Sequence, residues 1–307
     1  MLIEASDRTT LTELLTAHAL EFRAKLLIHG ALLFRGFGIT DVESFDSVIA
    51  AWSPERLSYT FRSTPRTAVA DRVYTATEYP AKYSIPLHNE NAYARQWPLT
   101  LLFGCLVPAL TGGMTPLADM REVTRAIGPD IVQEFAARRV MYVRHYHPDA
   151  DLPWQTVFQT QDPEVVARFC EQHGIRHQWL GKERLLSTTQ ICQGVAQHPH
   201  TAERVFFNQA HLFHVSSLGE ATAGAMIDVF GQDRLPRHAR FGDGAEIPAA
   251  TLAAVRAGFE AASIRFPWQA GDVLCLDNMQ MAHGRMPFTG PRKVLAALLE
   301  SYSSSES

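Results

Sequence analysis

The sequence predicts an α+β fold made mainly of β-strands with flanking helices. Apolar runs at Leu99–Val107 and Gly271–Asn278 have the length and composition of buried strands. Near the N-terminus, apolar residues over Leu11–Leu26 recur at helical spacing. No linker, low-complexity tract or internal repeat separates these segments. We therefore expect a single domain over residues 1–307, with a long mid-chain insertion at about 120–260.

The first third of the chain alternates helices and strands. Asp7 or Thr9 is expected to cap the first helix, and Thr40 with Glu43 forms a capping-box pattern for the second. The other expected elements follow from apolar periodicity, β-branched content and turn residues. The expected strands are Ala31–Phe37, Val73–Glu78, Val140–Tyr146, Arg204–Asn208 and Val294–Leu299, and the expected helices are those after Asp119, at Pro163–Glu171 and at Thr251–Ala262.

Composition excludes several classes of protein. With 46% hydrophobic residues the chain can bury a sizeable core, and its net charge of −4 disfavours nucleic acid or acidic membrane as partner. The longest apolar run, Pro98–Leu110, is too short to span a bilayer, and the N-terminus lacks the pattern of a secretory signal. The four cysteines are widely spaced and are expected to be reduced packing residues. We expect a cytoplasmic protein; its oligomeric state is open.

The segment Pro86–Asn91 contains a candidate metal motif. His88 and Glu90 are two residues apart, so on a strand both side chains point to the same face. His283 follows a predicted buried strand and completes a set of two histidines and one carboxylate. This set holds non-haem Fe(II) with open positions for oxygen and substrate. Early and late strands lie side by side in a double-stranded β-helix, or jelly-roll, which makes this spacing reasonable.

Two further residues are candidates for holding a 2-oxo acid on such an iron. Arg292 lies shortly after His283, and an arginine pairs bidentately with a carboxylate while keeping its charge. Thr115 follows the Gly112-Gly113 turn and offers a hydroxyl. We expect the segments around His283 and Arg292 to form an antiparallel hairpin, with a metal ligand on one arm and the cation near the other.

With these motifs in order, the chain resembles the TauD/TfdA family of Fe(II)- and 2-oxoglutarate-dependent dioxygenases. Within it, the chain is most similar to SyrP-like members, which accompany nonribosomal peptide and other specialised-metabolite pathways such as antibiotic biosynthesis. The resemblance runs from about residue 30 to the C-terminal strand. The residues that carry it are Ser63–Arg66, Tyr74–Pro80, Leu87–Tyr93, Trp97–Pro98, Gly112–Asp119, Trp154–Thr160, Phe207–Gln209, Gly271–Val273, Asp277–Asn278, His283–Arg285, Pro287–Phe288 and Gly290–Arg292.

The resemblance implies a jelly-roll core, with Fe(II), 2-oxoglutarate and O₂ as cofactor and co-substrates. It implies His88, Glu90 and His283 as iron ligands and Thr115 and Arg292 as the 2-oxoglutarate-binding pair, with no catalytic residue beyond the iron centre. Halogenating relatives carry a small residue in place of the carboxylate, so Glu90 favours hydroxylation.

One position departs from the family's pattern. Residue 145 is histidine where a small polar residue such as Asn is expected, and we interpret His145 as a mark of a different substrate pocket.

The expected substrate is an amino acid or an amino-acid-like carboxylate, free or tethered to a carrier protein. Arg66, Asn91 and Arg144 are the candidate substrate contacts, because Asn91 follows the metal motif and the two arginines can face a carboxylate. Desaturation or cyclisation with the same cofactors stays open. The alternative from another class is a catalytically silent jelly-roll that binds a small acid.

A second metal site is a competing interpretation of the remaining histidines. His198, His200, His211 and His214 supply enough ligands for zinc, although we favour a strand and loop that line the pocket. No nucleophile elbow, P-loop or dinucleotide fingerprint supports a hydrolase, kinase or dehydrogenase.

Overall fold

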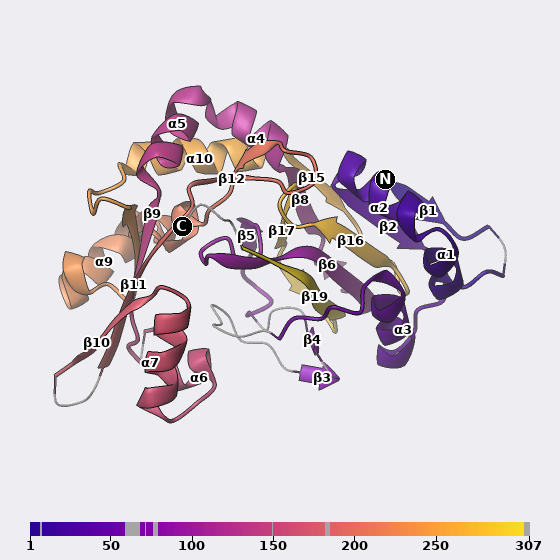
Figure 1. Ribbon diagram of the computed structural model, residues 1–307, viewed down its shortest axis with the longest axis horizontal. Coiled ribbons are helices and arrows are strands. Elements are labelled where there is room, and N and C mark those ends of the chain that lie inside the picture. The colour runs from indigo at the N-terminus through magenta and orange to yellow at the C-terminus, as the bar shows by residue number, and fades with distance from the viewer. Residues whose placement is uncertain are drawn as a thin grey trace.

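Two β-sheets face each other at the centre of the molecule (Figure 1). The computed structural model describes residues 1–6, 8–58, 68–70, 72–75, 79–148, 150–181 and 185–303. The larger sheet has the order β1 (Leu2–Glu4), β2 (Ala31–Arg35), β16 (Val273–Asp277), β6 (Gln96–Val107), β19 (Lys293–Ser303), β4 (Val73–Thr75) and β3 (Ala68–Ala70). The smaller sheet has the order β15 (Ser263–Phe266), β8 (Thr115–Asp119), β17 (Met281–Arg285) and β5 (Ile85–His88).

Apolar side chains from both sheets meet in one cluster. Phe103, Leu276 and Leu298 of the larger sheet pack in the same buried cluster as Leu117 and Met281 of the smaller one. Strands that are distant in sequence are neighbours here, since β6 pairs with both β16 and β19. This arrangement confirms the predicted jelly-roll core, and helices and strands contribute about equally to the fold around it.

The other face of the larger sheet is covered by three N-terminal helices, which Figure 1 shows in indigo. They are α1 (Leu11–Ala17), α2 (Ala19–His29) and α3 (Val42–Trp52), and their apolar faces pack on β6, β16 and β19. The predicted first helix is divided at His18, and Thr10 caps it with Glu13 in a capping box. Asp41 with Ser44, instead of Thr40 with Glu43, caps α3. In both cases a better-placed acceptor one residue later takes the cap.

The mid-chain segment forms a sheet of its own, with the order β10 (Arg176–Leu180), β11 (Leu185–Cys192), β9 (Val140–His145) and β14 (Arg237–Phe241). Short pairs join β12 (Val195–Gln197) to β13 (Arg204–Phe206), and β7 (Thr111–Gly112) to β18 (Phe288–Thr289). The remaining helices are α4 (Met120–Ile127), α5 (Pro129–Arg138), α6 (Trp154–Phe158), α7 (Pro163–Gln172), α8 (Ala210–Phe213), α9 (Glu220–Phe230) and α10 (Ala249–Ala261), with 3₁₀ turns at Val215–Leu218 and Gln232–Arg234. Asp119 caps α4 as predicted.

The mid-chain segment packs on the metal-motif side of the core. Tyr142 and Phe207 share a buried cluster with Leu87, Trp97 and Ala282. A single domain over 1–307 with an insertion at about 120–260 remains our prediction for the domain organisation. None of the described helices is long and apolar enough to cross a membrane. All four cysteines are buried and unpaired, as expected.

The predicted hairpin between His283 and Arg292 is wrong. Strand β17, which carries His283, pairs with β5 and β8 in the smaller sheet, whereas β19 pairs with β6 and β4 in the larger one. The chain after β17 therefore crosses from one sheet to the other. Alternation of apolar residues identifies a strand but does not identify its partner, which is why the sequence suggested local pairing.

Candidate metal and co-substrate site

The three predicted metal ligands converge between the two sheets. His88 ends β5 and is the register partner of His283 on β17. The two imidazole rings are 4.5 Å apart between centroids. One ligand atom from each of His88, Glu90 and His283 lies within 4.8 Å of the other two, and Glu90 and His283 are buried. This spacing fits one metal ion held by two imidazoles and a carboxylate.

A backbone hydrogen bond fixes the tautomer of the His88 ring. Its Nδ1 lies 2.8 Å from the carbonyl oxygen of Pro86. A carbonyl oxygen can only accept a hydrogen bond, so Nδ1 carries the proton and Nε2 keeps a lone pair. Histidines that bind metal commonly donate their other N–H to a carbonyl or carboxylate in this way.

Asn278 holds the turn that carries Glu90. Its Oδ1 accepts a hydrogen bond from the Glu90 backbone N–H at 2.7 Å, and its Nδ2 donates to the Glu90 carbonyl oxygen at 2.9 Å. The same Nδ2 donates to the Pro98 carbonyl oxygen at 2.8 Å, and the Asn89 side chain donates to the Asn278 carbonyl oxygen at 2.7 Å. Because Glu90 follows β5 and lies outside it, this side chain takes the place of strand pairing in fixing the carboxylate's position.

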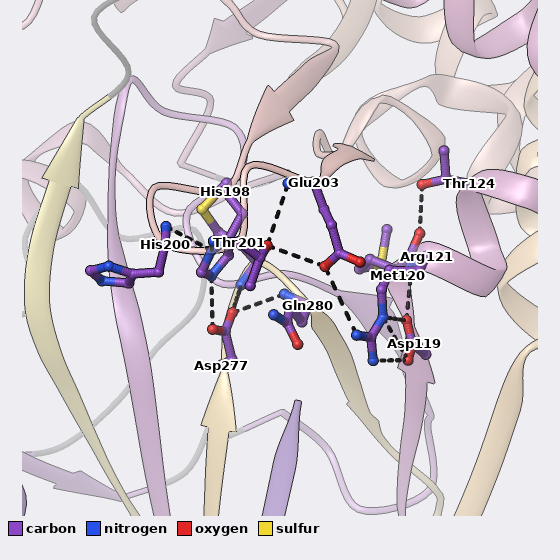
Figure 2. Close-up of polar contacts among 11 residues, drawn as sticks. Asp119, Met120, Arg121, Thr124, His198, His200, Thr201, Glu203, Asp277 and Gln280 are labelled. Carbon is purple, nitrogen blue, oxygen red and sulfur yellow. Dashed lines mark hydrogen bonds and ion pairs between the residues drawn. The ribbon is translucent and has the colours of Figure 1, made fainter. Parts of the chain in front are cut away.

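The neighbouring Asp277 ties the end of β16 to the mid-chain segment, as Figure 2 shows. His198 Nδ1 accepts hydrogen bonds from two backbone N–H groups, those of His200 and Thr201, at 3.1 Å each. The proton is therefore on Nε2, which donates to Asp277 Oδ2 at 2.8 Å. Both nitrogens of His198 are occupied, so this histidine is no zinc ligand.

The other histidines of the proposed second metal site lie in separate places. His211 Nε2 lies 3.1 Å from the Leu87 carbonyl oxygen, and its ring stacks on Phe259. Burial lowers the pKa of His211 to about 3. His214 instead meets Glu246. The four histidines do not converge on one point within the described part of the chain.

A second cluster of ligand-type side chains combines His214, His238 and Glu246. Both histidines have Nε2 within 2.9 Å of Glu246 Oε1. Both Nδ1 atoms accept backbone N–H groups, from Ser216 and from Val215. Each Nε2 therefore carries a proton and donates to the carboxylate, which leaves no lone pair for a metal.

A small cavity beside His88 and His283 contains the predicted co-substrate residues. It is lined by Ile85, His88, Phe103, Thr115, Trp268, His283, Gly284, Arg285, Arg292 and Val294, and we call it the co-substrate cavity. Trp268 donates its indole N–H to Thr115 Oγ1 at 2.8 Å, so the Thr115 hydroxyl keeps its own proton to donate. No acidic side chain is among these lining residues, although two arginines are.

Arg292 is a buried cation that lacks an anionic partner among the described residues. Its Nε has no hydrogen-bond partner. Burial, and secondly the nearby Arg285, lower the pKa of Arg292 to about 10. The side chain therefore stays charged near neutral pH in a place that disfavours charge. A dicarboxylate such as 2-oxoglutarate, with one end at the metal, fits this arrangement.

The structure describes two of the three predicted substrate contacts, Arg144 and Asn91. Arg66 lies outside the described residues. Arg144 is buried, 3.4 Å from Asp151, and Arg237 on the adjacent strand pairs with the same carboxylate. His145 points to the opposite face of β9, where its Nδ1 lies 2.9 Å from the Leu235 carbonyl oxygen. On that face it lines a cavity of about 170 Å³, and its interpretation as a mark of the substrate pocket stays a prediction.

Asn91 lines a larger pocket, of about 510 Å³, between the core and the mid-chain segment. Arg95 and Gln190 also line it. Neither residue was identified from the sequence, because Gln190 reaches this pocket only through the packing of β11 against the core. A sequence feature that could have identified Arg95 is its position, five residues after the candidate ligand Glu90.

A jelly-roll with two histidines and a carboxylate between its sheets, next to an arginine without a carboxylate partner in the described part of the chain, is typical of the class of non-haem iron oxygenases that use a 2-oxo acid. The chain belongs to the TauD/TfdA family: the family model "Taurine catabolism dioxygenase TauD, TfdA family" matches residues 3–298. It is therefore an Fe(II)- and 2-oxoglutarate-dependent dioxygenase.

The chain is also similar to individual proteins over most of its length. The dapdiamide synthesis protein DdaC of Enterobacter agglomerans is 41% identical over 278 residues, which cover 90% of this chain and 84% of that protein. PvcB of Pseudomonas aeruginosa, an Fe, α-ketoglutarate-dependent oxygenase from an isonitrile synthetic pathway, has a TM-score of 0.55 at 17% identity, over 97% of this chain and 84% of that chain. An asparagine oxygenase solved with Fe(II), 3-hydroxyasparagine and succinate has a TM-score of 0.56 at 14% identity, over 93% and 79%.

Proposed function

We propose that this dioxygenase hydroxylates an unactivated C–H bond of an amino acid or amino-acid-like substrate in specialised metabolism, with His88, Glu90 and His283 as iron ligands. The observation that carries the proposal is the cluster of these three ligand groups within 4.8 Å, near Arg292, which has no carboxylate partner among the described residues. Desaturation or cyclisation of the same substrate remains the second outcome.

Iron and 2-oxoglutarate, when bound, supply the oxidative decarboxylation to succinate and CO₂ and the activation of O₂ for C–H oxidation. The chain's part is to bind and orient. His88 presents Nε2 because Pro86 accepts the Nδ1 proton. Arg292 and Thr115 bind the far carboxylate of 2-oxoglutarate, one by charge and the other by its hydroxyl proton. Asn278 keeps the Glu90 turn in place.

Glu90 supports hydroxylation over halogenation. Its carboxylate would serve as the third protein ligand where a halogenase would need room for a halide, and the Asn278 contacts to its backbone fix the turn. The substrate class is supported by the names of two similar proteins, one from dapdiamide synthesis and the other an asparagine oxygenase. Whether the substrate is free or tethered to a carrier protein is part of the test.

The first test is spectroscopic. Fe(II) and 2-oxoglutarate are added to the protein without oxygen, and the visible charge-transfer band of the chelate is recorded. We expect a band in the wild type and none in His88→Ala. Absence of the band in the wild type would support the alternative, a silent jelly-roll that binds a small acid.

The second test identifies the substrate class. Succinate release in air is measured with a panel of free amino acids and of aminoacyl-carrier proteins, and product mass is recorded. A gain of one oxygen atom indicates hydroxylation, whereas a loss of two hydrogens indicates desaturation or cyclisation. If no member of the panel stimulates succinate release above the uncoupled rate, the proposed substrate class is wrong.

A further inference from the structure

The pocket of about 510 Å³ lies next to the iron motif and differs in chemistry from the co-substrate cavity. It is lined by Asn91, directly after Glu90, and by Leu298 of β19, whose side chain belongs to the cluster between the two sheets. Its size is in the range of pockets that hold small-molecule ligands. We call it the open pocket.

Arg95 is the cation of the open pocket. Its Nε donates to the Ile191 carbonyl oxygen at 3.0 Å, and it forms no ion pair with a carboxylate of the described residues. A methyl group on Gly174 would lie 2.7 Å from Arg95 Nη1, so the guanidinium lies against bare backbone. The guanidinium is thus held in place without a counter-charge from the part of the chain that the structure describes.

Among the described residues that line the open pocket there is no acidic side chain. A guanidinium with free N–H donors in such a setting binds a carboxylate through charge-assisted, often bidentate hydrogen bonds. These lining residues offer no carboxylate to an ammonium group.

Two residues with side-chain amides, Asn91 and Gln190, also line the open pocket. Asn91 Oδ1 and Gln190 Oε1 are buried and accept no hydrogen bond from any described residue, while Gln190 Nε2 donates to the His173 carbonyl oxygen at 2.8 Å. The Gln190 side chain is only 5% exposed. A buried acceptor without a donor is unfavourable, and a ligand that brings N–H groups relieves this. Neutral amide acceptors without a carboxylate suit amide N–H groups better than an ammonium group.

We propose that the open pocket binds the primary substrate, a small carboxylate that carries an amide, with Arg95 on its carboxylate and with Asn91 and Gln190 accepting its amide N–H groups. This proposal rests on the proposed function, since it names the substrate class of the same iron site. Arg95 thereby replaces Arg66 and Arg144 as the main anchor of the substrate's negative charge.

The test compares acids with their neutral amides. Protein is loaded with Fe(II) and 2-oxoglutarate without oxygen, so that Arg292 is occupied, and N-acetyl-L-asparagine or its C-terminal amide is titrated in. Binding is followed by calorimetry and by the shift of the visible band. In the wild type the acid should bind about tenfold to a hundredfold tighter than the amide, as expected for a charged hydrogen-bond pair.

Variants assign the preference to Arg95. Arg95→Met should abolish the preference for the acid, and Arg95→Lys should restore part of it, while both keep the 2-oxoglutarate band. Arg176→Met is the matched control, because Arg176 is exposed, lies two residues from the lining residue Gly174 and does not line the pocket. Gln190→Leu should weaken both probes several-fold and leave their ratio unchanged.

The outcomes separate the two proposals. A wild type that forms the visible band but binds acid and amide equally overturns the Arg95 proposal and leaves the proposed function standing. The same holds if Arg95→Met keeps the preference. Unchanged affinity in Gln190→Leu overturns the assignment of the amide contact. A wild type without the visible band overturns the proposed function itself.

Discussion

The co-substrate cavity and the open pocket both hold an arginine without a carboxylate partner among the described residues, but they are built differently. Arg292 lies in the cavity between the two core sheets, whereas Arg95 lies in a turn and faces strands and a helix of the mid-chain segment; both residues are partly exposed. The cation between the core sheets suits a co-substrate that the whole family shares. The cation set against the mid-chain segment suits a substrate that changes from one relative to the next.

The largest expected effect is on the metal. His88→Ala or His283→Ala should remove the visible chelate band and reduce 2-oxoglutarate turnover to background, because two protein ligands cannot hold the ion in this geometry. His200→Ala is the control, since His200 is exposed and its hydrogen bond to His198 comes from its backbone N–H, which the substitution keeps. A normal band in His88→Ala would refute the ligand assignment.

Arg292→Leu should weaken co-substrate binding and, at the same time, stabilise the protein. It should weaken 2-oxoglutarate binding by about 100-fold or more, the effect of removing one partner of a buried charge pair. The apo protein should become more stable by about 1–3 kcal/mol, measured by urea unfolding. The pKa of Arg292 is lowered to about 10 in the fold, so the unfolded chain binds this proton more tightly and the ionised group destabilises the fold below pH 10.

The effect of Arg292 on the free energy of unfolding should depend on pH. The destabilisation by Arg292 should be fully present at neutral pH and should fade as pH rises from about 10 towards the ordinary arginine pKa. Arg265→Leu, at an exposed arginine paired with Glu260, is the control and should change neither property. Unchanged 2-oxoglutarate affinity in Arg292→Leu would assign the co-substrate to another cation.

Asn278→Ala should lower iron affinity by about tenfold to a hundredfold, the usual size of an outer-shell effect. The Glu90 turn loses its hydrogen bonds to the Asn278 side chain, while all three ligands remain. Fe(II) titration of the visible band measures the change. Asn208→Ala is matched to it, because Asn208 is also a buried asparagine with backbone contacts, to Gly194 and Ala210. Equal losses of iron affinity in both variants would show that Asn278 acts through general stability.

The smallest effect is expected at His198. His198→Ala leaves Asp277 without its side-chain donor, and the protein should lose about 1–3 kcal/mol of stability in urea unfolding. Iron affinity should fall less than in Asn278→Ala, because Asp277 still accepts the N–H groups of Met279 and Gln280. If the free energy of iron binding falls by more than the free energy of unfolding, His198 instead helps to hold the metal ligands in place.

The co-substrate cavity was predictable from the sequence, and the open pocket was not. Apolar runs located β6, β16 and β19, and the short His88-x-Glu90 motif with a later histidine located the three candidate metal ligands that the structure brings together. The caps at Thr10 and Asp41 differed from the predictions by a residue or so, because neighbouring Ser, Thr and Asp compete for the same N–H groups.

The sequence by itself determined which residue types carry the chemistry, because the His88-x-Glu90 spacing brings two ligand-type side chains close together and a late strand supplies His283. Only the tertiary structure decided that β17 and β19 belong to opposite sheets, and that His283 and Arg292 therefore line one cavity. It also decided that Arg95 and Gln190, nearly a hundred residues apart in sequence, share a pocket. The physical reason is that a strand's side-chain pattern records which face is buried, whereas the strand it pairs with depends on the packing of the whole chain.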